Sequence, residues 1–306
     1  MRASQHWHAA SDGKKLFYRR FLPEGAPRAV VQIVHGISEH SARYARVAEA
    51  LTGAGHAVYV DDHRGHGETG KAVDELGWFD GGTVRVLQDL VELMALAKSE
   101  HPGLPYCLFG HSLGSMLVQS LIQTHGGELT CAVLSASSGK PPPLAVVGLG
   151  IARLEILRGG KRGTSRLAKA LSFDAWNKQF KASGNTAYEW LSRDRAEVDK
   201  YAADPFCGFD ASNEAWLQIL QLFFEIAKAE NRARIPKALP VYALAGSDDM
   251  VSNRTKELME LIRGYEKAGL SDVTLKIYPG GRHEMFNELN REEVTRDLLA
   301  WLSKKL

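Results

Sequence analysis

Short apolar runs rich in Val, Ile and Tyr alternate with longer segments of helical period along most of the chain. Parallel strands need crossover helices between them, so this alternation predicts an α/β fold with a mostly parallel central sheet and helices on both faces. The predicted strands lie near Leu16–Phe21, Ala29–Val34, Ala57–Val60, Tyr106–Phe109, Cys131–Ser135, Val241–Ala245 and Val273–Tyr278. The predicted helices cover Ser41–Leu51, ending at Gly53, and Thr83–Lys98, Leu113–Thr124, Arg254–Lys267 and Arg291–Leu306.

A long interruption breaks this alternation between residues 140 and 240, where helical patterns occur without a convincing strand. It begins with three prolines at 141–143, and residues 144–157 then form an apolar stretch too short to cross a bilayer. We therefore expect a core domain built from residues 1–139 and 236–306, with a helical cap inserted over residues 140–235. The apolar stretch could line an acyl channel, rest on lipid, or pack on the core, and its pattern leaves these alternatives open.

Composition and charge narrow the class of protein without indicating an activity. Of the 306 residues, 44% are hydrophobic and 24% are charged, as is usual for a soluble globular protein. The 38 Lys and Arg residues nearly balance the 36 Asp and Glu residues, so we expect no nucleic-acid partner. The odd number of cysteines, Cys107, Cys131 and Cys207, predicts free thiols. The polar N-terminus lacks a signal-peptide pattern, so we expect a cytoplasmic location, with peripheral membrane contact through the cap as an open alternative.

The most specific motif is Gly110-His111-Ser112-Leu113-Gly114, which lies between the predicted strand ending at Phe109 and a predicted helix. A G-x-S-x-G pattern in this context is typical of a nucleophile elbow, where the glycines let neighbouring backbone approach the serine closely. The serine follows a central strand, and open α/β sheets bind ligands at the carboxyl ends of their strands. We therefore predict that Ser112 is a nucleophile rather than the N-cap of a helix.

A serine hydroxyl needs a base, usually a histidine oriented by a carboxylate, and in such folds the chain order is Ser, Asp or Glu, His. Of the 11 histidines, only His283 follows His125, and it lies between the last predicted strand and helix. The strand Val241–Ala245 runs into Asp248 and Asp249, and spacing alone does not decide which carboxylate faces the imidazole. For the oxyanion hole, we expect backbone N–H donors from Leu113 and from Ile37, which follows an early strand.

Other motifs resemble one branch of the α/β-hydrolases, the monoacylglycerol lipases and lysophospholipases within the serine aminopeptidase S33 type. The similarity spans nearly the whole chain and is carried by His35-Gly36-Ile37-Ser38-Glu39-His40, Arg43-Tyr44, Asp62-His63-Arg64-Gly65-His66-Gly67, Ser192-Arg193-Asp194, Asp204-Pro205 and Arg282-His283-Glu284. It implies the α/β-hydrolase fold, and its Gly-x-x-Asp-x-Val pattern selects Asp249 as the acid. It also implies a structural role for Asp62, His63 and His66, a cluster whose residue types could otherwise bind a metal.

The resemblance and the motifs together predict a serine hydrolase that cleaves carboxylic esters, such as monoacylglycerols or lysophospholipids, through an acyl-enzyme. Ser112, Asp249 and His283 would be catalytic, and this chemistry requires no cofactor or metal. Three rivals remain open: a cofactor-free haloperoxidase, a non-catalytic ligand-binding homologue, and an aminopeptidase. The last would hold a substrate ammonium with acidic cap residues, for which the candidates are Glu189, Asp194 and Glu197.

Overall fold

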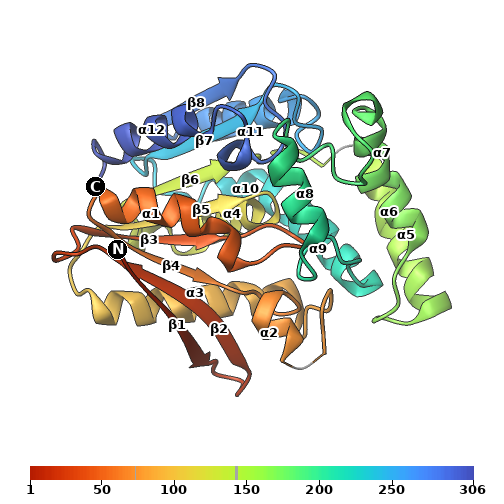
Figure 1. Ribbon diagram of the computed structural model, residues 1–306, viewed down its shortest axis with the longest axis horizontal. Coiled ribbons are helices and arrows are strands. Elements are labelled where there is room, and N and C mark those ends of the chain that lie inside the picture. The colour runs from red at the N-terminus through yellow and green to blue at the C-terminus, as the bar shows by residue number, and fades with distance from the viewer. Residues whose placement is uncertain (73, 142–143) are drawn as a thin grey trace.

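The computed structural model describes residues 1–72, 74–141 and 144–306. Its centre is an eight-stranded sheet with the order β1-β2-β4-β3-β5-β6-β7-β8 (Figure 1). The pairs β1–β2 and β2–β4 are antiparallel, and the other pairs are parallel, so the predicted mostly parallel sheet is confirmed. The strands are β1 (Arg2–Ala9), β2 (Lys15–Leu22), β3 (Ala29–Val34), β4 (His56–Asp61), β5 (Tyr106–His111), β6 (Cys131–Ser135), β7 (Val241–Gly246) and β8 (Val273–Tyr278).

The sequence pattern missed strand β1, which pairs along its whole length with β2 at the edge of the sheet. Its residues alternate between exposed and half-buried, and its one large apolar side chain, Trp7, is 49% exposed. The other strands were predicted from short apolar runs. An edge strand that buries neither face fully can form without such a run, so the pattern does not indicate it.

Helices cover both faces of the sheet because the strand side chains alternate between two apolar layers. On one face, Val31 and Ile33 pack with α1 (Ala45–Gly53) and α12 (Arg291–Leu302). On the other face, Val30 and Val34 pack with a second set of helices. That set comprises α3 (Gly82–Glu100), α4 (Leu113–Thr124), α9 (Asn213–Ala227) and α11 (Lys256–Lys267).

Predicted helices differ from the structure at several of their ends. The helix predicted to reach Leu306 ends at Leu302, and two others differ for reasons of backbone geometry. The helix expected from Ser41 begins as the 3₁₀ turn η1 (Ser41–Tyr44). Its continuation α1 includes Gly53, because the glycine with left-handed backbone after this helix is Gly55, with φ of 88°. Helix α11 begins at Lys256 rather than Arg254, because residues 253–255 have φ values of 51°, 51° and 68°. The remaining short elements are α2 (Gly67–Lys71), η2 (Gly126–Glu128), η3 (Lys181–Ser183) and η4 (Met285–Asn287).

The segment predicted as a cap contains helices joined by loops, and its described residues form no strand apart from the isolated bridge Thr164–Ser212. Its helices are α5 (Leu144–Gly159), α6 (Arg166–Leu171), α7 (Phe173–Lys178), α8 (Arg195–Ala203), α9 and α10 (Ala229–Arg232). Helix α5 packs on α9, which in turn packs on α3 and α4, while α5 to α7 lie together at one end of the molecule (Figure 1). The domain boundaries remain a prediction, and prolines 142 and 143 lie outside the described residues.

Candidate active site

Ser112 lies in the turn between β5 and α4, with φ of 52° and ψ of −120°. A residue with a side chain rarely adopts this conformation, so the surrounding structure must hold it in place. The two motif glycines make this turn possible, because a Cβ atom on Gly114 would overlap the carbonyl oxygens of Val34 and His35. A Cβ atom on Gly110 would overlap the backbone at residues 114 and 115.

His283 and Asp249 form a buried pair next to this turn, with 2.9 Å between Nδ1 and Oδ1. Their side chains are 2% and 0% exposed. Burial alone would raise the pKa of Asp249, but His283, together with hydrogen bonds from Ser252 and the N–H of Val251, lowers the pKa below its usual value. The side chain of Asp248 is half-buried and forms no hydrogen bond to His283 in the described part of the chain. Of the two carboxylates that spacing left open, Asp249 therefore faces the imidazole.

One cavity brings the half-buried side chain of Ser112 and the His283 ring together. Within the described ranges, Ser112 Oγ forms no hydrogen bond to the ring. The ring is instead packed between Trp190 and His111, whose ring centroids lie 5.0 and 4.8 Å away. His111 also lies 3.3 Å from the Ser135 hydroxyl, and burial and the nearby His283 lower its pKa to about 4. A neutral His111 therefore packs beside His283 without adding a charge.

The backbone N–H groups of Ile37 and Leu113 have no hydrogen-bond acceptor among the residues that the structure describes. Leu113 is the first residue of α4, where an N–H lacks an intrahelical partner. Both residues line a second cavity that also includes Ser112. Two unused donors thus lie beside the serine, which is the arrangement that an oxyanion requires.

A buried network of charges joins the loop that carries Ile37 to the loop that carries His283. Glu39 accepts hydrogen bonds from the Gly36 N–H (2.6 Å) and the Tyr44 hydroxyl (2.8 Å). Arg43 contacts Glu39 at 2.7 Å and forms a bidentate pair with Glu284 at 2.6 and 2.7 Å. Burial alone would raise the pKa of Glu284, yet Arg43 lowers it to about 2. This network fixes the two loops relative to each other.

The loop residues Asp62, His63 and His66 are not arranged as metal ligands. Asp62 accepts hydrogen bonds from the N–H groups of Ser41 and Glu68, and His63 Nδ1 lies 2.6 Å from an oxygen of Asp61. His66 contacts the carbonyl oxygen of Arg64 at 3.0 Å. Each side chain thus holds a turn of the chain, as the family resemblance implied.

Sequence reasoning missed the aromatic side chains that line the cavities at Ser112. Trp176, Trp190 and Trp216 line the cavity that contains Leu113, together with Phe173. These are three of the six tryptophans of the chain, and all three belong to the interrupting segment, a concentration that could have indicated them. Among the described residues, none from 144–157 lines either of these two cavities.

The fold and the site define an α/β-hydrolase, and the comparison with known families agrees. The model of the family described as serine aminopeptidase, S33, matches residues 25–290. The chain therefore belongs to this family and is an enzyme of the serine hydrolase class. The resemblance seen in the sequence is confirmed.

Named relatives align with the chain over nearly its full length. A monoacylglycerol lipase from Mycolicibacterium smegmatis is 29% identical, with 99% of this chain and 98% of the relative covered. The monoglyceride lipase of Homo sapiens is also 29% identical, with 96% and 89% covered. The crystal structure of a thermostable carboxyl esterase from Bacillus coagulans in complex with glycerol superimposes with a TM-score of 0.91. It is 29% identical and covers 100% of this chain and 99% of its own.

Proposed function

We propose that the protein hydrolyses carboxylic esters through an acyl-enzyme formed on Ser112. His283 removes the proton from the Ser112 hydroxyl, which attacks the ester carbonyl, and the N–H groups of Ile37 and Leu113 stabilise the oxyanion. Asp249 holds the imidazole through Nδ1, so that Nε2 is available to the serine. The alcohol leaves with the proton from His283, and a water molecule then releases the acid by the same steps.

The observation that carries this proposal is the buried His283–Asp249 pair on the cavity of Ser112, with two unused backbone donors beside it. Catalytic hydrogen bonds often tighten only when substrate binds, so the Ser112 hydroxyl need not contact the His283 ring before a substrate is bound. No chemistry beyond general acid–base and nucleophilic catalysis is needed.

The test is the replacement of Ser112 by Ala, with Ser120→Ala, in the helix α4 that follows this turn, as the matched control. Ser112→Ala should lose nearly all hydrolysis of p-nitrophenyl esters and all labelling by a fluorophosphonate probe, whereas Ser120→Ala should keep both. Wild-type turnover in Ser112→Ala would refute the assignment of the nucleophile.

For the substrate, we propose a monoacylglycerol or a similar monoester of a small polar alcohol. The cavity beside Leu113 is lined by Phe173 and three tryptophans and suits the acyl chain. The other cavity includes Lys169 and Asp174 and suits the alcohol hydroxyls. The names of the relatives, monoacylglycerol lipase and monoglyceride lipase, support this assignment.

The aminopeptidase alternative has less support from the contacts of the cap. Each of the three acidic residues considered for an ammonium site is paired elsewhere, and none lines a cavity at Ser112. The pairs are Glu189–Arg195 at 2.8 Å, Asp194–Arg291 at 2.6 Å and Glu197–Arg46 at 2.7 Å.

We further propose that α5 and α6 rest on an anionic lipid surface during catalysis. Their large apolar side chains are unusually exposed: Val146 62%, Val147 57%, Leu154 50%, Leu157 83%, Leu167 46% and Leu171 51%. Residues 144–171 contain six Lys and Arg residues and one Glu, so the region is basic, and Lys161, Arg162 and Lys169 pair with acidic residues outside it. Apolar side chains beside basic ones are typical of segments that bind anionic membranes. Within residues 1–72, 74–141 and 144–306, no helix has the length and apolar character needed to span a membrane.

Vesicle sedimentation tests this surface. Wild-type protein should bind vesicles of phosphatidylcholine with phosphatidylglycerol, and the double variant Leu154→Ser with Leu157→Ser should bind them markedly less. Exposed Leu289→Ser, on the loop before α12, is the control for a general loss of apolar surface. Equal binding by the double variant and the wild type would contradict the proposal.

A further inference from the structure

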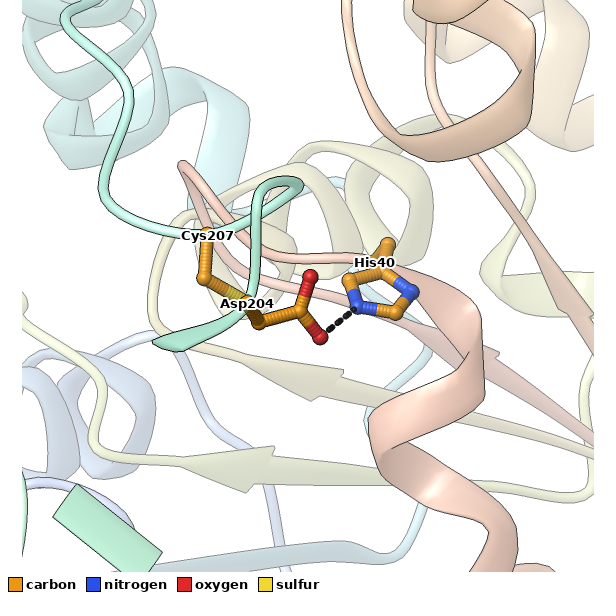
Figure 2. A group of neighbouring side chains, drawn as sticks. All are labelled: His40, Asp204 and Cys207. Atoms are coloured by element: carbon orange, nitrogen blue, oxygen red, sulfur yellow. Dashed lines mark hydrogen bonds and ion pairs between the residues drawn. The ribbon is translucent and has the colours of Figure 1, made fainter. Parts of the chain in front are cut away.

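Away from the serine, three potential metal ligands from two distant segments meet at the junction of the core and the predicted cap (Figure 2). His40 follows the loop that carries Ile37, and Asp204 and Cys207 follow α8. His40 Nε2 lies 2.9 Å from Oδ2 of Asp204, and one ligand atom from each residue lies within 4.8 Å of the other two. Nothing in the proposed hydrolysis uses these three side chains.

We propose that His40, Asp204 and Cys207 bind a divalent transition metal of the zinc class, with water as the fourth ligand. An imidazole, a carboxylate and a thiolate are the three ligand types that Zn²⁺ takes in proteins, usually in tetrahedral geometry. The His40 side chain is 9% exposed and that of Asp204 30%, so the site is anchored on the core and reachable from solvent at the carboxylate. The described residues contain no other group of three such ligands within these distances.

The charges around the site favour a divalent cation. Asp204, Glu39 and Glu284 each influence the Cys207 thiol as negative charges, and Arg43 is the opposing positive charge. Three carboxylates and one guanidinium leave an excess of two negative charges, which becomes three when the Cys207 thiol ionises, and a divalent ion would reduce this excess to one. Lys71 is a further positive charge near this loop, because its Nζ lies 5.1 Å from the ring of Phe206, between Asp204 and Cys207 in the chain.

Binding requires one proton to leave and another to move. Without metal, the carboxylate of Asp204 accepts the Nε2–H of His40, and burial raises the pKa of the Cys207 thiol. On binding, the thiol loses its proton to solvent as the metal–sulfur bond forms. The proton of His40 moves from Nε2 to Nδ1, because Nε2 must offer its lone pair to the metal. Metal–oxygen and metal–nitrogen bonds then replace the His40–Asp204 hydrogen bond.

The loop that carries two of the ligands is short and tied to the core. Tetrahedral bonds to zinc place ligand atoms roughly 3.5 Å apart, so atoms that now lie within 4.8 Å of one another would need to move by at most about 1 Å. The loop turns at Asp204, and the residue after Cys207, Gly208, has φ of 69° and donates its N–H to the carbonyl oxygen of Ser38 at 3.0 Å. The bound metal would thus strengthen a link between the predicted cap and the residue that follows Ile37.

Titration of the chelator-treated, reduced protein with Co²⁺ tests the site, because a cobalt–thiolate bond gives a charge-transfer absorption that carboxylate and imidazole ligands do not. Wild-type protein should bind one Co²⁺ with this absorption, and Zn²⁺ should displace it. Cys207→Ser should lose the absorption, and Asp204→Asn should bind at least about tenfold more weakly. Asp199→Asn, at an exposed carboxylate of α8, is the matched control and should bind like the wild type.

A second measurement uses the wild-type protein alone and so does not depend on the folding of a variant. Zn²⁺ should release about one proton per site and should slow alkylation of Cys207, followed by mass spectrometry. Unchanged alkylation of Cys207 at saturating Zn²⁺, or a thiolate absorption that survives in Cys207→Ser, would overturn the proposal.

Discussion

Asp249 accepts a 2.9 Å hydrogen bond from Nδ1 of His283, whereas the preceding residue, Asp248, has its side chain elsewhere. The turn after β7 produces this difference, because the Asp249 N–H bonds to the carbonyl oxygen of Gly246 and the Asp248 N–H bonds to that of Gly281. Adjacent residues on such a turn point in different directions, and only one carboxylate reaches the histidine.

We therefore expect Asp249→Asn and Asp248→Asn to differ sharply in catalysis. An amide at position 249 no longer favours the imidazole tautomer with its proton on Nδ1, so kcat should fall by about four orders of magnitude, as in other serine hydrolase triads. Asp248→Asn is the matched control and should stay near the wild-type rate. Steady-state hydrolysis of a p-nitrophenyl ester measures both, and a comparable loss in the two variants would contradict the assignment of the acid.

The close packing of Gly114 predicts a stability effect that is separate from catalysis. A methyl group there would overlap the backbone oxygens of Val34 and His35, which cannot move without disturbing β3. Gly114→Ala should lower the free energy of unfolding by about 3 kcal/mol or prevent folding. Gly150→Ala, in α5 with open space around it, should instead raise it by about 0.5–1 kcal/mol. Urea denaturation distinguishes these outcomes, and equal midpoints would contradict the packing argument.

Buried histidines predict that the fold loses stability in mild acid. Burial lowers the pKa of His66 to about 3 and that of His111 to about 4, and it also lowers the pKa of His35. In the unfolded chain these groups bind protons near pH 6.5, so between pH 6.5 and 4 the unfolded state binds more protons than the folded state. The free energy of unfolding should fall with pH by up to about 1.4 kcal/mol per unit for each histidine.

Urea midpoints measured from pH 7 to pH 5 test this dependence. His111→Gln removes one of the groups, so its stability should decline less steeply with falling pH than that of the wild type. A stability that stays constant between pH 7 and pH 5 would contradict this prediction.

The aromatic lining predicts how acyl-chain length affects the rate. Trp216 extends from α9 to the cavity beside Leu113, so Trp216→Ala should weaken contacts with a long acyl chain more than with acetate. The ratio of kcat/KM for p-nitrophenyl decanoate to that for the acetate should fall about tenfold or more. Trp7→Ala, on the edge strand β1, is the control. If the ratio is unchanged in Trp216→Ala, this cavity does not bind the acyl chain.

The sequence by itself determined the alternation of strands and helices, the turn at Ser112, the candidate base His283 and the family of the protein. These features depend on local rules. Neighbouring residues in the sequence determine strand and helix periods, glycines in tight turns and short motifs. The resemblance to a known family, rather than spacing, selected Asp249 over Asp248. The edge strand β1 was not predicted from the sequence, because a strand without a fully buried face needs few apolar residues.

The tertiary structure alone decided which distant side chains meet. His40 and Asp204 are 164 positions apart, and the three tryptophans reach the cavity only because α7, α9 and the segment at Trp190 pack over the carboxyl ends of the strands. The sequence likewise did not determine the exposure of α5, because the same apolar stretch could pack on the core or face solvent. Such contacts depend on how the cap helices pack on the core. That packing is the sum of many weak interactions between segments far apart in the sequence, and no pattern within one segment predicts them.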